Sequence, residues 1–93
     1  MAEKSEVTTA GPKVKWDDAG MKTTYANVCN VTGTREEVAL LFGTNQTGVT
    51  EARELSVKLS DRIILSPYAA KRLAALLKNV VEEYEKRFGV LGE

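Results

Sequence analysis

Hydrophobic and polar residues alternate with the two-residue period of a β-strand in three parts of this chain. Residues 24–32 place polar and apolar side chains on both faces of the expected strand. Residues 38–42 are apolar on both faces, which is typical of a strand that is covered from two sides. Residues 55–65 alternate leucine and valine with serine and lysine. The pattern predicts three strands, and a helix over residues 35–42 is the main alternative to the second.

Two irregularities are expected within this sheet. A turn is predicted around Gly33, between the first two strands, and a polar loop is predicted over residues 43–53. Strict alternation in the third strand would place Asp61 on the same apolar face as Leu59 and Ile63. Because a buried, unpaired carboxylate is destabilising, we predict a bulge or bend at residues 60–62.

The period then lengthens to between three and four residues, which predicts an amphipathic helix over residues 67–88. Ser66 is a favourable N-cap, and Pro67 suits the first helical position. Gly89 is the expected C-terminal stop. A helix of this length spans about 33 Å, whereas a strand of six residues spans about 20 Å. The far part of its apolar stripe should therefore extend beyond the sheet.

These elements predict an α+β fold, in which a three-stranded antiparallel meander is followed by one long C-terminal helix packed on the sheet. Residues 1–12 are polar and predict a flexible tail, and residues 13–93 form a single domain. Residues 13–16 alternate as either a short edge strand or an arm. The small core, the strand with two apolar faces and the extended helix stripe together predict a homodimer.

Composition and charge exclude several kinds of site. The 93 residues include 13 basic and 13 acidic side chains, which argues against nucleic-acid binding driven by net charge. The chain contains no histidine, so the commonest general base and zinc ligand are missing. Cys29 is the only cysteine and is expected to be a small buried apolar residue, so no disulfide forms within the chain. We expect no enzymatic activity, no cofactor and no metal, including at the adjacent Asp17 and Asp18.

The chain also lacks the features of an exported or membrane protein. Its first fifteen residues contain no apolar core like that of a signal peptide. No stretch approaches the roughly 18 apolar residues of a membrane span. We therefore expect a cytoplasmic protein.

The start of the helix is the one candidate small-ligand site. Free backbone N–H groups at a helix start favour an anion. Basic side chains lie close to this helix start in the sequence. The candidate anion-binding residues are Arg62, Ser66, Lys71 and Arg72. The alternative is that these basic residues are solvated and pair with Asp61 or Glu54.

Two long segments resemble a known family. They are WDDAGMKTTYANVCNVTGTREEVALLFGTNQ at residues 16–46 and LSDRIILSPYAAKRLAALLKNVVEEYEKRFG at residues 59–89. Together they resemble small bacterial proteins known as domain of unknown function 3467. The resemblance implies a small cytoplasmic bacterial protein and assigns no catalytic residue.

Two functions follow from these expectations. The first is a non-enzymatic, oligomeric interaction or adaptor protein that binds a protein partner through its sheet face and loops. Its predicted partner-binding residues are Trp16, Tyr25, Asn27, Asn45 and Gln46. The alternative is a regulatory protein that binds nucleic acid on its sheet, through exposed aromatic and basic side chains. Few aromatic and basic residues lie on the expected strands, so we favour the protein partner.

Overall fold

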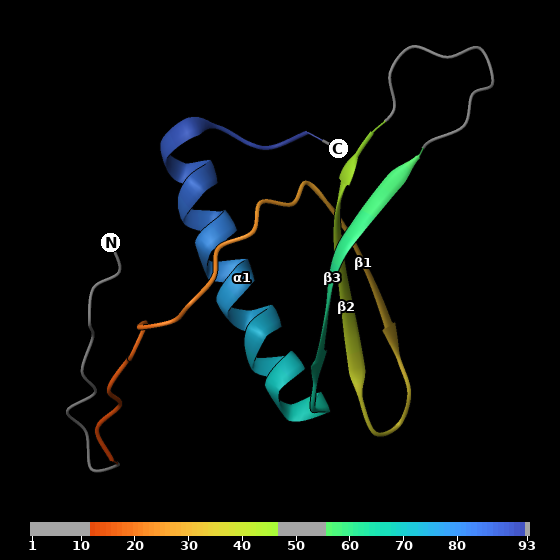
Figure 1. Cartoon of the computed structure of the whole chain (residues 1–93). Coiled ribbons are helices and arrows are strands. Elements are labelled where there is room, and N and C mark those ends of the chain that lie inside the picture. The colour runs from red at the N-terminus through yellow and green to blue at the C-terminus, as the bar shows by residue number, and fades with distance from the viewer. Residues whose placement is uncertain (1–11, 47–55, 93) are drawn as a thin grey trace.

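The computed structural model describes residues 12–46 and 56–92. Three antiparallel strands form one sheet in the order β1-β2-β3, and a helix follows the third strand (Figure 1). The elements are β1 (Val28–Gly33), β2 (Val38–Asn45), β3 (Val57–Leu65) and α1 (Pro67–Phe88). The predicted α+β meander with one C-terminal helix is therefore confirmed. Most of the predicted tail, residues 1–11, and the loop residues 47–53 lie outside the described residues.

The strand boundaries differ from the prediction at the first hairpin. β1 begins at Val28 rather than at residue 24, and residues 12–27 form an extended arm instead. The turn lies at residues 34–37, where the Oγ1 atom of Thr34 accepts hydrogen bonds from the N–H groups of Glu36 and Glu37, each at 3.1 Å. Gly33 is the last residue of β1 and not the centre of the turn. The segment from Val38 is a strand, so the helical alternative is wrong.

The predicted bulge in the third strand is confirmed. Phe42 of β2 pairs with Asp61, whereas the next residue, Gly43, pairs with Leu59. Ser60 is therefore the extra residue, with no partner in β2. Because the side chains of a strand alternate between faces, this insertion places Leu59 on the opposite face from Asp61 and Ile63.

The register assigns the side chains to two faces of the sheet. The inner face lies toward the arm and α1, and comprises Cys29, Val31, Val38, Leu40, Phe42, Asp61, Ile63 and Leu65. The outer face points away from them, and comprises Val28, Asn30, Thr32, Ala39, Leu41, Leu59, Arg62 and Ile64. Both faces are largely apolar near the centre of the sheet. This agrees with the sequence of residues 38–42, which is apolar on both sides of the strand.

The helix begins and ends where the sequence predicts. Its first free N–H groups are capped by the Ser66 hydroxyl, which accepts a hydrogen bond from the N–H of Ala69 at 3.1 Å. At the other end, the N–H of Gly89 donates to the carbonyl of Glu85 at 2.9 Å, with a φ of 106° that favours glycine.

The helix packs on the sheet only through its first turns. Ala69, Ala70 and Leu73 are half-buried there. Further along, Val80 is 65% exposed and Phe88 is 68% exposed. Figure 1 shows α1 diverging from the sheet toward its C-terminal end. The extension of the apolar stripe beyond the sheet is therefore confirmed.

The described residues contain no buried hydrophobic side chain. Gly43 is the one residue among them that is fully buried. Cys29 is exposed, so the prediction of a buried cysteine is wrong for this protomer. It lies on the inner face of the edge strand β1, where the arm and helix do not enclose it. The folded protomer thus leaves most of its apolar surface open.

Candidate functional site

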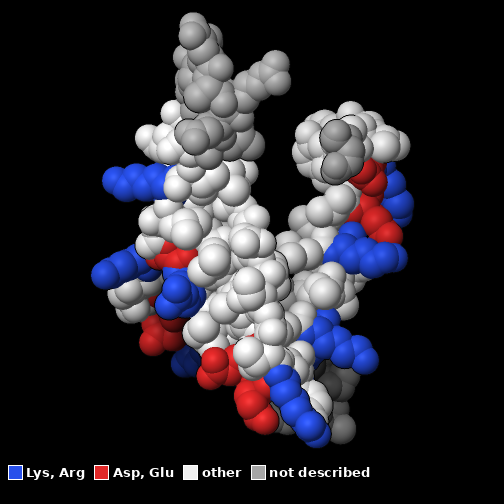
Figure 2. Space-filling model, turned by 90° about the vertical axis from the view of Figure 1, so that its right-hand side faces the viewer, with Lys and Arg blue, Asp and Glu red and all other residues white. Residues whose placement is uncertain are grey.

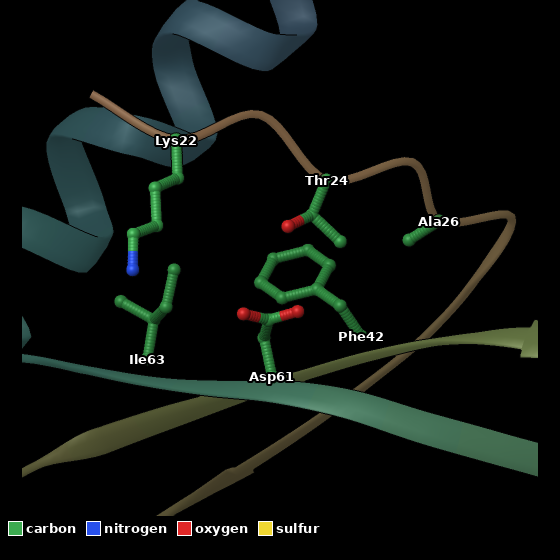
Figure 3. A pocket seen from close by; sticks show the side chains of 6 residues that line it. All are labelled: Lys22, Thr24, Ala26, Phe42, Asp61 and Ile63. Carbon is green, nitrogen blue, oxygen red and sulfur yellow. The ribbon is translucent and has the colours of Figure 1, made fainter. Parts of the chain in front are cut away.

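A cavity lies between the arm and the inner face of the sheet. It has a volume of about 350 Å³. Lys22, Thr24 and Ala26 line it from the arm, and Phe42, Asp61 and Ile63 line it from the sheet. Figure 3 shows the arm side chains pointing down toward the sheet and the strand side chains pointing up toward them. The arm alternates like a strand here, so every second residue points into the cavity.

The bulge supplies the main polar group of this cavity. The Ser60 hydroxyl lies 2.6 Å from Oδ1 of Asp61 and 3.3 Å from the carbonyl oxygen of Phe42. A hydroxyl has one proton, and the shorter contact is with the carboxylate, which is the stronger acceptor. Figure 3 shows the Lys22 side chain reaching down beside Ile63, on the same side of the sheet as Asp61. The cavity thus has mainly apolar walls, one carboxylate and one ammonium group.

Sequence reasoning did not identify this cavity. The sequence predicts Asp61 outside the core and, as one alternative, as a partner of the basic residues near the helix start, and it assigns Lys22 no role. The usable signal is the alternation of Lys22, Thr24 and Ala26 just before the first strand. The predicted strand begins at residue 24 and so includes Thr24 and Ala26, which belong to the arm.

Three of the predicted partner-binding residues hold together the end of the sheet where β1 begins and β2 ends. The Oδ1 atom of Asn27 accepts a hydrogen bond from the N–H of Asn45 at 3.0 Å, and the N–H of Asn27 donates to the carbonyl of Gly43 at 3.0 Å. The N–H of Gln46 donates to the carbonyl of Ser56 at 2.8 Å. The three residues thus lie at the same end of the sheet, and the bonds of Asn27 and Gln46 extend the sheet beyond its regular strands.

The other two predicted partner-binding residues are exposed aromatics on the arm. Trp16 is 63% exposed and Tyr25 is 73% exposed. Trp16 is therefore not a core anchor of the protomer. It precedes a tight turn in which Asp17 Oδ1 accepts from the N–H of Ala19 at 3.0 Å and Gly20 has a φ of 83°. Asp17 thus has a local structural role.

The structure distributes the candidate anion-binding residues over two sides of the sheet. Ser66 caps α1, and Lys71 and Arg72 are exposed on its second turn. Arg62 belongs to the outer face, where it borders a shallow depression of about 220 Å³ with Leu41 and Leu59. The helix lies on the inner side, so Arg62 points away from the cap. Anion binding at the helix start stays a prediction.

The described part of the chain holds neither a metal-binding cluster nor a helix that could span a membrane. Residues 12–46 and 56–92 contain no group of three or more side chains that could hold a metal ion. Within the same residues, α1 is too polar to cross a membrane, and no other helix is present.

The sequence profile of one family matches residues 1–93, the whole chain. The chain belongs to the family described as Protein of unknown function (DUF3467). No curated protein and no solved structure matches it. The resemblance predicted from the two quoted segments is therefore confirmed. Membership of the DUF3467 family assigns no activity, so the proposals below depend on the geometry.

Proposed function

We propose that this DUF3467 protein is a non-enzymatic, homodimeric interaction protein that binds a protein partner through the outer face of its sheet and the adjoining loops. The observation that carries the proposal is the exposed apolar centre of that face. Leu59 is 54% exposed and Ile64 is 47% exposed, and Arg62 lies between them on the same side of the sheet. Exposed apolar groups flanked by an arginine are typical of protein interfaces.

The arrangement of the chain supports this choice of face. The arm and α1 both lie on the inner side, so the outer face is left open by the described elements (Figure 1). Asn27, Asn45 and Gln46 fix the end of the sheet from which residues 47–55 leave it. Trp16 and Tyr25 supply exposed aromatic side chains on the arm. Because the arm lies on the inner side, a partner on the outer face would meet Trp16 and Tyr25 by extending around the edge of the sheet.

The test is affinity purification of the tagged protein from its native cell, with and without nuclease. We expect a protein partner that remains bound after nuclease treatment and is lost with Leu59→Asn. The matched control is Val31→Asn, because Val31 is 58% exposed on the inner face and should leave binding intact. Partner loss on nuclease treatment would favour the nucleic-acid alternative. Equal binding by wild-type protein and Leu59→Asn would contradict the proposed surface.

A further inference from the structure

One side of α1 forms a continuous apolar stripe that the protomer leaves open. It comprises Leu73, Leu76, Leu77, Val80, Val81, Tyr84 and Phe88. All of these side chains are exposed except Leu73, which is half-buried. Figure 2 shows two columns of the molecule separated by a hollow whose visible walls are mostly free of Lys, Arg, Asp and Glu. Because α1 diverges from the sheet, its stripe faces this hollow.

We propose that a second copy of this chain occupies the hollow, with the two α1 helices antiparallel and stripe against stripe. The two-fold axis passes between residues 78 and 79, so residues equally far from that point meet. Leu73 then contacts the partner's Tyr84, and Leu77 contacts the partner's Val80. This inference deepens the homodimer of the proposed function, on which it rests, and leaves the outer face free for the protein partner.

The spacing of the stripe supports this pairing. Its central residues Leu73, Leu77, Val80 and Tyr84 recur at alternating intervals of four and three, which is the seam of a helix pair. The antiparallel arrangement also matches large side chains with small ones. Phe88 lies on the same flank as the partner's Ala70, which leaves room for the ring.

Charge complementarity favours an antiparallel over a parallel arrangement of the two α1 helices. The first half of α1 carries Lys71, Arg72 and Lys78, whereas its second half carries Glu82, Glu83 and Glu85, followed by Lys86 and Arg87 in the last turn. On one flank of the stripe, Arg72 comes close to the partner's Glu83. On the other flank, Lys71 comes close to the partner's Glu85. A parallel pair would instead place Arg72 opposite the partner's Lys71 and Glu83 opposite the partner's Glu85, which is unfavourable.

The available area shows that the helix stripe is one part of a larger interface. Residues 73–88 form a stripe about 24 Å long and about 10 Å wide, or about 240 Å². A stable interface buries about 800 Å² on each partner. The arm crosses the inner face of the sheet over Phe42, Asp61 and Ile63, so the partner's helix meets the arm as well as the open part of the hollow.

The arrangement is tested by disulfide trapping in a Cys29→Ser background, which removes the one native thiol. Two single-cysteine proteins, Leu73→Cys and Tyr84→Cys, are oxidised separately and then after mixing and subunit exchange. We expect a cross-linked dimer mainly in the mixture. In the antiparallel pair, the two copies of residue 73 lie about 16 Å apart along the axis, which is too far for a disulfide.

The outcomes separate this interface from the homodimer itself. Efficient cross-linking of Leu73→Cys alone would overturn the antiparallel arrangement. A mixture that stays uncross-linked, while light scattering gives twice the 10.2 kDa chain mass, would show a dimer with another interface. A persistent monomer would overturn both this inference and the homodimer in the proposed function.

A matched pair of variants provides a second test in solution. Val80→Glu places a charge at the centre of the stripe, and we expect roughly hundredfold weaker dimerisation, as for a central interface residue. Ala75→Glu is the control, because Ala75 lies on the polar side of α1 with Lys71, Lys78 and Glu82. Sedimentation equilibrium measures both. Equal dimerisation of Val80→Glu and wild-type protein would contradict the proposed interface.

Discussion

Gly43 lies where β2 and β3 approach too closely for a side chain. It lies beside the bulge, and a Cβ atom at this position would meet the carbonyl oxygen of Lys58 and lie 3.0 Å from the Cα atom of Leu59. Both are backbone atoms of the paired strand, so they cannot rotate away. Glycine is therefore required here by close approach of two strands.

We predict that Gly43→Ala lowers the free energy of unfolding by about 1–3 kcal/mol, the usual effect of overpacking. Gly33→Ala is the matched control, since a Cβ there would lie 3.8 Å from the carbonyl oxygen of Glu37, an ordinary contact. Urea denaturation followed by circular dichroism measures both variants. Equal stability of the two would show that β3 shifts freely at the bulge.

Variants of Asn27 can show whether its side chain stabilises the sheet or binds the protein partner. Asn27→Ala removes the acceptor of the Asn45 N–H and should lower the free energy of unfolding by about 1 kcal/mol. Asn27→Asp keeps an acceptor oxygen and should retain most of that stability. Thermal denaturation compares the two variants with wild-type protein. If Asn27→Ala weakens partner capture without loss of stability, the side chain contacts the partner rather than β2.

The start of α1 is stabilised by the residues next to it in the sequence. The Ser66 hydroxyl satisfies the N–H of Ala69, and no acidic residue lies in the first turn of α1. We predict that Ser66→Ala lowers the free energy of unfolding by about 1 kcal/mol, and that Ser66→Asp preserves it. Chemical denaturation measures the difference. An unchanged midpoint for Ser66→Ala would mean that water replaces the cap without loss.

The elements with strong local signals could be predicted from the sequence. A serine–proline start and a glycine stop define α1, and the position of Asp61 predicts the bulge. The start of β1 could not be predicted in this way. Residues 24–27 alternate like the strand that follows, but they cross the inner face as part of the arm. Alternation reports which side chains share a direction, and it does not report whether the backbone pairs with a neighbouring strand.

The candidate site could not be predicted from the sequence for a similar reason, because it forms between two separate segments of the chain. The cavity arises because Lys22 and Thr24 on the arm face Phe42 and Asp61 on the sheet. That contact joins segments far apart in the chain and depends on the path of the arm, which the alternation of its residues does not determine. Asn27 was identified as a candidate from its polarity on a strand, whereas its geometry shows a backbone-capping role.

At the scale of the whole molecule, the single chain leaves its apolar surface open. Its described hydrophobic side chains are all at least partly exposed, and α1 contacts the sheet only at its first turns. Burial of apolar surface is the main favourable contribution to folding. In the proposed dimer a second copy covers the helix stripe, and we predict that much of the stability comes from this contact.

The proposed dimer predicts that the stability of the protein depends on its concentration, because folding would then be coupled to association. For a folded dimer in equilibrium with unfolded chains, a hundredfold rise in concentration adds about 2.7 kcal/mol by mass action. For a molecule of about 190 residues, that corresponds to a rise in Tm of roughly 5–10 °C. Differential scanning fluorimetry from about 1 to 100 μM measures the shift, with Val80→Glu as the comparison. A wild-type Tm that stays constant over this range would show that the single chain is stable without a partner.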